Sequence, residues 1–377
     1  MPTCILHAGM PKTGTSSIQE SLRFGLEDPR FRLLTLGQSN AIFFLQALFA
    51  DEPRKWWVFR RKGYSDARIR RFRDRFDRRL RRSLRRAREA GATPIVSAED
   101  CWMASKPFLE RLKAFMAEEG FETRVIAYVR PFRGLVESLF QQQVKLPASV
   151  IDLDWRPERA RERPILDYAQ RLANLEDTFG RERLVVRQFA RKGLAGGCVV
   201  RDFCTSLGIE LADTAIVRVN ESLPADAVRM LYCLNRFATG SPPPIWKSRL
   251  LARRLKDLGG ETIRFHSEAL APLADHIARQ EREVLGRFGI DLREDRPADD
   301  ASCIREEADL YRFSPASLDW LARSSGRSPI VAPAGEATGR AVAVQVAALS
   351  SRPDIRSVWA YASRHLRTRM RWIRHGD

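Results

Sequence analysis

Cysteine and histidine are scarce and dispersed along this chain of 377 residues. The six cysteines form no CxxC pair, and the five histidines do not cluster with them. A structural zinc site needs closely spaced ligands and a disulfide framework needs paired cysteines, so neither is expected. We therefore predict no bound metal and a reducing, cytoplasmic setting.

Long apolar segments are also missing. The most apolar run, residues 41–50, is about half the length of a membrane span and contains Gln46. The N-terminus lacks the basic start and long apolar core of a signal peptide, because a short apolar stretch leads at once into a glycine-containing turn. We expect no transmembrane segment. Any membrane contact would be peripheral, through a basic helix or tail.

Positive charge is concentrated in one segment. Residues 54–88 contain 17 Lys and Arg against 3 Asp, and so carry +14 of the net charge of +18. Apolar residues recur there at every third or fourth position, which predicts an amphipathic helix closed by Gly91. They are Ile69, Phe72, Phe76, Leu80, Leu84 and Ala87.

The cationic face of this helix has two interpretations. It is either a solvated surface or a wall that attracts an acidic acceptor, beside which Trp56, Trp57 and Tyr64 could stack on sugar rings. Specific nucleic-acid binding is not expected, because the charge is accompanied by no recognisable reader motif.

Short apolar runs alternate with segments of helical periodicity over most of the chain. Strands are expected at residues 3–8, 93–98, 123–129 and 184–189. Helices are expected from Thr15, at 106–118, 131–145, 165–179 and 194–207, and through most of 224–288. Strands separated by helices pair in parallel through right-handed crossovers. The predicted fold is a three-layer α/β sandwich with a central, mainly parallel sheet of the P-loop nucleotide-binding type and helical additions.

The last part of the chain differs in composition. Residues 327–340 are rich in Pro, Gly and Ala, and residues 364–375 form a basic tail. We therefore divide the chain into a domain at 1–292 and a C-terminal extension at 293–377, partly helical or flexible.

The first expected strand leads into a turn with the composition of a phosphate-binding loop. From His7 to Ser17 the chain reads HAGMPKTGTSS, with two glycines, one lysine and four hydroxyl residues. Strand, glycine-containing turn and helix aim backbone N–H groups and a helix N-terminus at an anion. A nucleoside-triphosphate loop places lysine directly before the Mg²⁺-binding Ser or Thr. Here Lys12 follows Gly9 by three residues, so the loop is of another kind.

A second candidate site follows another strand. Arg130 comes directly after the strand that ends at Val129, and Ser138 lies eight residues later on the next expected helix. Arginine offers a planar fork that binds phosphate through two hydrogen bonds, and serine adds a neutral donor. Alone, a strand-end arginine more often forms a surface ion pair. At the same sheet edge as the phosphate loop, it indicates a second phosphate site.

Both motifs resemble one enzyme family. The order Pro11-Lys12-Thr13-Gly14-Thr15-Ser16 resembles the 5′-phosphosulfate loop of sulfotransferases that use 3′-phosphoadenosine-5′-phosphosulfate (PAPS). Arg130 and Ser138 resemble the pair that grips the donor's 3′-phosphate in that family. Residues 137–145 and 220–223 are similar to bacterial, carbohydrate-type members, and the resemblance covers residues 3–290.

The resemblance implies PAPS as co-substrate and no metal. It implies transfer of a sulfuryl group to an acceptor hydroxyl on a carbohydrate or glycolipid, and the acceptor can be anionic. It also implies roles for residues of this chain: Lys12 at the leaving oxygen, Thr13, Gly14, Thr15 and Ser16 around the 5′-phosphosulfate, and Arg130 with Ser138 on the 3′-phosphate.

A general base should take the proton of the acceptor hydroxyl, and two residues are candidates. Glu99 follows the expected strand at 93–98 and would emerge beside the phosphate loop. It could equally belong to a helix cap with Ser97. His7 lies on the strand that enters the loop and could titrate near neutrality, or it could be a buried core histidine.

Two other functions remain open at this point. An ATP-dependent phosphotransferase of the P-loop class would need a Mg²⁺ carboxylate. A non-catalytic protein could use the basic helix to bind polyanions.

Overall fold

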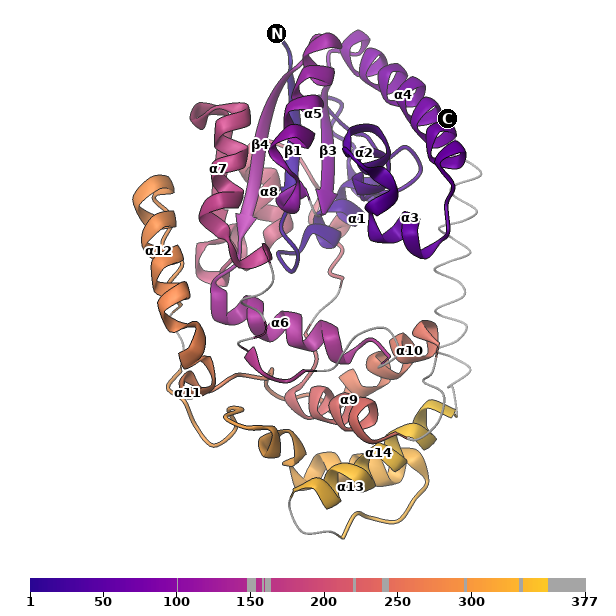
Figure 1. Ribbon diagram of the computed structural model, residues 1–377, viewed down its shortest axis with the longest axis vertical. Helices are drawn as coiled ribbons and strands as arrows, with labels where there is room; N and C mark the ends of the chain where they lie inside the picture. The colour runs from indigo at the N-terminus through magenta and orange to yellow at the C-terminus, as the bar shows by residue number, and fades with distance from the viewer. Residues whose placement is uncertain are drawn as a thin grey trace. The chain divides into compact units, whose positions relative to one another are not determined.

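The computed structural model describes residues 1–99, 101–147, 154–157, 159, 164–219, 222–238, 244–294, 297–331 and 335–351. The chain divides into two compact units that interleave along the sequence (Figure 1). The first unit comprises Met1–Phe132, Pro164–Asn220 and Ile277–Arg293, and the second comprises Arg133–Arg163, Glu221–His276 and Glu294–Asp377. The boundary expected after residue 292 lies close to the point where the chain last passes from the first unit to the second, between Arg293 and Glu294. Its role as a functional boundary stays a prediction. The basic tail lies outside the described residues.

The first unit is built around a five-stranded sheet in the order β2-β3-β1-β4-β5, with every pairing parallel. The strands are β1 (Thr3–Gly9), β2 (Phe31–Leu33), β3 (Thr93–Glu99), β4 (Glu122–Val129) and β5 (Leu184–Gln188). The central strand β1 is buried from Cys4 to Gly9, as expected of a parallel strand covered on both faces. This confirms the predicted α/β class, to which the structure adds the short edge strand β2.

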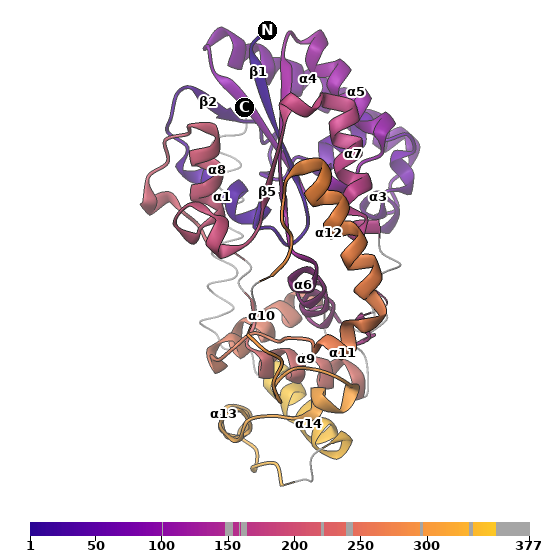
Figure 2. The ribbon, with the colours of Figure 1, turned by 90° about the vertical axis from the view of Figure 1, so that its left-hand side faces the viewer.

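Helices cover both faces of the sheet and complete three layers (Figure 2). Those on one face are α1 (Thr15–Gly25) and α8 (Val199–Leu207), and those on the other include α4 (Asp66–Glu89), α5 (Lys106–Glu118) and α7 (Tyr168–Phe179). Beneath α1 and α8, Ile18, Ile126 and Phe203 join one hydrophobic cluster. The sheet is therefore held between two apolar layers, and its carboxyl edge is left to form the site.

Two expected helices begin at least five residues later than predicted. The basic helix α4 starts at Asp66, because Ser65 caps it by accepting a hydrogen bond from the Arg68 N–H. The basic residues before it belong to a short 3₁₀ turn, η1 (Pro53–Lys55), and to α3 (Trp57–Arg61). The helix expected at residue 194 starts at Val199, after two 3₁₀ turns, η6 (Arg191–Gly193) and η7 (Ala195–Gly197).

The second unit is helical where it is described. It contains most of α6 (Phe132–Val144), together with α9 (Ala225–Phe237), α10 (Ile245–Leu255), α11 (Ser267–Leu270), α13 (Pro315–Ser325) and α14 (Glu336–Ser351). Helix α14 packs closely against α9 and α13. A Cβ at Gly339 would come within 2.8 Å of the Phe237 and Tyr311 rings, so glycine permits this contact. The remaining long helix, α12 (Ala274–Phe288), is shared by the two units.

Two compositional expectations can be compared with the described part of the chain. No helix there is both long and apolar enough to cross a membrane. All six cysteines are free and buried. The cytoplasmic location stays a prediction.

Candidate active site

The loop between β1 and α1 has the geometry of an anion-binding turn. Gly14 caps α1 in the left-handed conformation (φ 75°), and its carbonyl accepts hydrogen bonds from the N–H groups of Ser17 and Ile18. The N–H groups of Thr15 and Ser16 lie in the first turn of α1, where the helix offers them no acceptor. They therefore point out of its N-terminal end. This is the positive end of the helix dipole, so the loop offers both donors and charge to an anion.

Close contacts with neighbouring atoms require glycine at both positions, Gly9 and Gly14. A Cβ at Gly9 would lie 2.8 Å from the Thr15 side chain and 3.0 Å from the Ala98 carbonyl. A Cβ at Gly14 would lie 2.6 Å from the Val199 side chain, in addition to its positive φ. The loop is therefore wedged between β3 and α8.

Lys12 adopts a left-handed backbone conformation with φ 69°, which is uncommon for a residue with a side chain. Neighbouring contacts hold it there. The Thr13 hydroxyl donates to the Met10 carbonyl at 2.7 Å, and Arg130 Nη1 donates to the Lys12 carbonyl at 2.9 Å. Backbone strain of this kind persists only where the surroundings impose it, and it concentrates at functional sites.

The electrostatics of the loop centre on the Lys12 ammonium group. Its pKa is lowered, first by partial burial and then by the nearby Arg130, while the Glu99 carboxylate acts in the opposite direction. The Lys12 ammonium group forms no ion pair with a described residue. Lys12, Glu99 and Arg130 thus lie within electrostatic reach of one another at the carboxyl edge of β1, β3 and β4.

Arg130 belongs to this edge because β4 ends one residue before it. Its guanidinium lies over the Phe189 ring, with the central carbon 5.6 Å from the ring centroid. Its backbone carbonyl accepts a hydrogen bond from the Tyr168 hydroxyl at 2.8 Å. Phe189 follows β5 and also approaches Gly14. Phe189 was not among the predicted site residues, although its position at the end of an expected strand of the same sheet was the available signal.

Glu99 is the last residue of β3 and pairs in register with Gly9 of β1. Its side chain is half-buried, and its backbone N–H donates to Asn40 Oδ1 at 3.1 Å. The alternative of a helix cap with Ser97 is not what the structure shows, because the Ser97 hydroxyl faces His7 and Gln19 instead. Glu99 therefore lies beside the phosphate loop, where an acceptor hydroxyl would have to be deprotonated.

His7 lies in the core of the first unit. Its side chain is fully buried, and Nδ1 lies 2.8 Å from the Ser97 hydroxyl oxygen. Among the described residues, Nε2 has no hydrogen-bond partner, and the ring packs 5.2 Å from that of Phe203. Burial lowers the pKa of His7 to about 3. This environment matches the core alternative for His7, and the choice of Glu99 as the base stays a prediction.

Ser138 lies on α6, in the part of that helix that belongs to the second unit. The expected pairing of Ser138 with Arg130 on one phosphate stays a prediction. The roles of Thr13, Thr15 and Ser16 also stay predictions. In the structure, the hydroxyls of Thr13 and Thr15 both face the Met10 carbonyl, at 2.7 and 3.5 Å, and so shape the loop from within.

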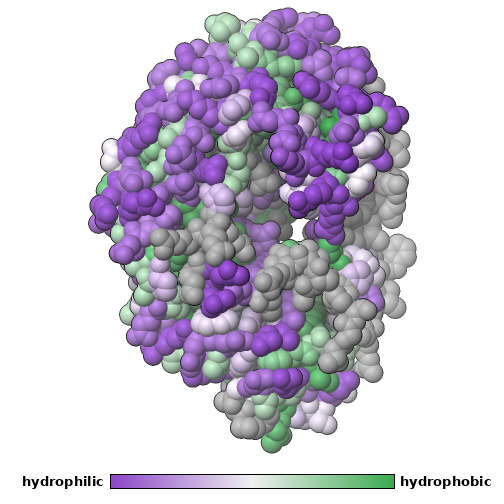
Figure 3. All heavy atoms as spheres, in the orientation of Figure 1, coloured by the Kyte–Doolittle hydropathy of each residue, from purple (hydrophilic) through white to green (hydrophobic). Residues whose placement is uncertain are grey.

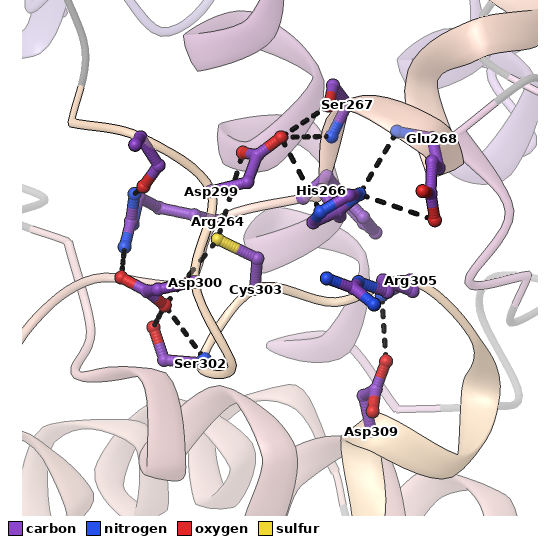
Figure 4. Close-up of polar contacts among 12 residues, drawn as sticks. Arg264, His266, Ser267, Glu268, Asp299, Asp300, Ser302, Cys303, Arg305 and Asp309 are labelled. Atoms are coloured by element: carbon purple, nitrogen blue, oxygen red, sulfur yellow. Dashed lines mark hydrogen bonds and ion pairs between the residues drawn. The ribbon is translucent and has the colours of Figure 1, made fainter.

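A polar cluster in the second unit brings serine, histidine and aspartate together (Figure 4). Asp299 Oδ2 accepts hydrogen bonds from the backbone N–H and the hydroxyl of Ser267, and lies 3.7 Å from His266 Nε2. The serine therefore bonds the carboxylate and not the imidazole, unlike a nucleophile activated by histidine. The cluster fastens the segment around Asp299 to that around His266, a structural role.

In the part of the chain that the structure describes, no group of three or more His, Cys, Asp or Glu side chains is arranged to hold a metal ion.

The solved structures to which this chain is similar include two sulfotransferases. No protein-family model and no curated protein sequence matches the chain. The sulfotransferase domain from the curacin biosynthetic pathway is 16% identical with a TM-score of 0.35, over 59% of this chain and 79% of that domain. A sulfotransferase from Alicyclobacillus acidocaldarius is also 16% identical with a TM-score of 0.35, over 74% of this chain and 96% of its own. Likeness at this level assigns no activity, so the function must be argued from the residues of the site.

Proposed function

We propose that this chain is a sulfotransferase that uses PAPS and sulfates a hydroxyl group on a carbohydrate or glycolipid. The observation that carries the proposal is the strained Lys12, held in the phosphate loop by Arg130 and facing the charge of Glu99. The cationic side chains of Lys12 and Arg130 at a helix N-terminus would bind the anionic donor, and the Glu99 carboxylate beside them would act as the base.

The donor would bind through the first unit. The N–H groups of Thr15 and Ser16 fit the oxygens of the 5′-phosphosulfate, and the hydroxyl of Ser16 is half-buried beside them. Arg130 fits the 3′-phosphate, with Ser138 as the second donor in the sequence-based assignment. The planar guanidinium already lies over the Phe189 ring, which restrains its orientation.

The transfer would be an in-line displacement at sulfur. A bond forms between the acceptor oxygen and the sulfur, and the bond between the sulfur and the bridging phosphate oxygen breaks. The leaving 3′-phosphoadenosine-5′-phosphate keeps the electron pair, and Lys12 stabilises the charge that develops on it. Glu99 takes the proton of the acceptor hydroxyl. The protein's contribution is positioning and charge stabilisation, as in phosphoryl transfer.

Calorimetric titration tests the proposal directly. The purified chain is titrated with 3′-phosphoadenosine-5′-phosphate without metal, and with ATP and Mg²⁺ in parallel. Micromolar binding of the first ligand, lost in Lys12→Ala, supports a PAPS site. A preference for ATP with Mg²⁺ would favour the phosphotransferase alternative. Binding of neither ligand would overturn the proposal and leave a polyanion-binding protein.

A further inference from the structure

Five arginines form a straight row on the outer face of α4. They are Arg71, Arg75, Arg78, Arg82 and Arg85, and all five side chains are exposed. Their spacing alternates between four and three residues, which keeps them on one side of a helix with 3.6 residues per turn. Fourteen residues separate the first from the last, so the row is about 21 Å long.

The five exposed guanidiniums form a concentrated positive charge. None of the five guanidiniums forms an ion pair with a described residue. Among the acids of α4, Asp66 pairs with Arg54 and Asp77 pairs with Arg81, while Asp74 and Glu89 form no ion pair with a described residue, so five arginines face two carboxylates. Like charges spaced three and four residues apart destabilise a helix. The repeated arginines therefore oppose helix stability and indicate a ligand of opposite charge.

The inner face of α4 is already occupied, which decides against insertion into a membrane. Ile69, Leu80 and Leu84 are buried beneath the helix. Phe72 and Phe76 stack on each other, and both rings contact that of Phe43. A helix that lies in a bilayer needs a free apolar face for the lipid. The outer face of α4 carries charge instead, and hydrophilic side chains dominate this region of the surface (Figure 3).

One aromatic side chain of α3, the helix that precedes α4 in the sequence, is available to a ligand. Trp57 of α3 is 56% exposed, next to the exposed basic residues Arg60 and Arg61. The other two aromatic residues considered from the sequence have internal roles. The Trp56 ring packs 4.9 Å from that of Phe59, and the Tyr64 ring lies under the Arg68 guanidinium at 4.2 Å. An exposed indole face suits a sugar ring, whose C–H groups stack on aromatic surfaces.

The row also leads toward the candidate active site within the first unit. Helix α4 ends just before β3 begins, so it runs antiparallel to β3. Helix α3, which precedes α4, lies near the end of β3, whose last residue is Glu99 (Figure 1). A linear ligand bound along α4 would approach Glu99 with one end.

We propose that the arginine row of α4, with Trp57, is a binding track for a linear anionic polysaccharide, and that this polysaccharide is the acceptor. The chemistry is charge pairing of guanidinium groups with carboxylate or sulfate groups at intervals along the chain, plus stacking of one sugar on the indole. The acceptor assignment rests on the sulfotransferase activity proposed above, whereas the binding track does not.

The test compares two triple variants that lose the same charge. Arg71→Gln/Arg78→Gln/Arg85→Gln interrupts the row. Arg249→Gln/Arg323→Gln/Arg327→Gln removes three exposed arginines of the second unit that also lack ion pairs with described residues. Affinity for heparin, a linear sulfated polysaccharide, is measured for each over a range of salt concentrations. The row variant should bind at least tenfold more weakly, and its salt dependence should lose about 2 to 3 units of slope if each contact contributes about 0.7 to 0.9. An equal loss in the control would reduce the effect to net charge and overturn the track.

Trp57→Ala distinguishes a polysaccharide from other polyanions. It should weaken binding of heparin and leave binding of inorganic polyphosphate unchanged, because polyphosphate has no sugar ring to stack. A stronger affinity of the wild-type chain for duplex DNA, or for phosphatidylserine vesicles, than for heparin would overturn the proposal in favour of those partners.

Titration with 3′-phosphoadenosine-5′-phosphate separates the two levels of the proposal. Both triple variants should bind this ligand like the wild type. If the wild type does not bind it, the sulfotransferase proposal fails and the acceptor role fails with it, while a specific loss of heparin binding in the row variant would still establish the track. If it binds and the row variant binds heparin normally, the track alone is wrong.

Discussion

Replacing Arg130 with alanine should separate its two possible contributions to donor binding. In the structure the guanidinium already makes one bond, from Nη1 to the Lys12 carbonyl at 2.9 Å. A guanidinium has five N–H donors, and we propose that others of them donate to the 3′-phosphate when the donor binds. A charge-assisted hydrogen bond contributes about 1.5–3 kcal/mol, so losing one or two of them should cost about 2–4 kcal/mol. This corresponds to a loss of affinity of about 30- to 700-fold.

The measurement is a cycle with two ligands and two proteins. Wild type and Arg130→Ala are titrated with 3′-phosphoadenosine-5′-phosphate and with adenosine 5′-monophosphate, which lacks the 3′-phosphate. If Arg130 binds the 3′-phosphate, the variant loses affinity for the first ligand and keeps it for the second. An equal loss for both ligands would mean that Arg130 acts by holding Lys12 in the loop, and would refute the 3′-phosphate assignment. Arg130→Lys, which keeps the charge without the planar fork, should restore only part of the affinity.

Three further predictions concern the other residues of the site. Lys12→Ala should abolish turnover while the thermal unfolding transition is retained. Because the pKa of Lys12 is lowered, its charge is lost at a lower pH than that of an exposed lysine, and donor affinity should weaken there. Lys12→Arg should remove this pH effect. Glu99→Gln should leave donor binding intact and reduce kcat by about 10²- to 10⁴-fold, and an unchanged kcat would eliminate Glu99 as the base. The pKa of His7 falls from 6.5 to about 3 on burial, so the unfolded chain takes up a proton that the folded chain excludes, and stability is lost as pH falls from 6.5 toward 3, by up to about 1.4 kcal/mol per pH unit. Denaturant unfolding at several pH values should show this slope reduced in His7→Phe, and an identical slope in both proteins would contradict the buried neutral histidine.

The sequence predicted the elements whose signals are local. Helix α5 has the predicted bounds, and β3 and β4 differ by one residue at one end, because their apolar runs are long and their ends are marked by turn residues. Strand β2 was missed because three residues, Phe31 to Leu33, carry no periodicity. It is a strand only because it pairs with β3. The start of α8 was predicted too early because Leu194 is apolar and buried, as a residue on the inner face of a helix would be. Gly196 and Gly197 have positive φ and interrupt the helix there, and the fold decides that conformation.

The sequence predicted which types of residue meet at the carboxyl edge of the sheet, but not how they contact one another. Lys12, Glu99 and Arg130 do gather there, because parallel strands end together. The left-handed conformation of Lys12 and its bond to Arg130 join residues 118 positions apart, and no local pattern encodes them. His7 could not be resolved either, because its burial depends on Ser97 and Phe203 from other elements.

The interleaving of the two units has a consequence for synthesis on the ribosome. Helix α7 of the first unit is tied to α12, since Gln280 accepts a hydrogen bond from the Ala169 N–H and Arg287 pairs with Glu176. The residues from Ile277 onward are therefore needed to complete a unit whose first strand begins at Thr3. Domains of most long chains fold in turn as they emerge, the N-terminal one first. Here the nascent chain must carry an incomplete sheet-containing unit while both earlier segments of the second unit are made, and that interval is when it most needs chaperones.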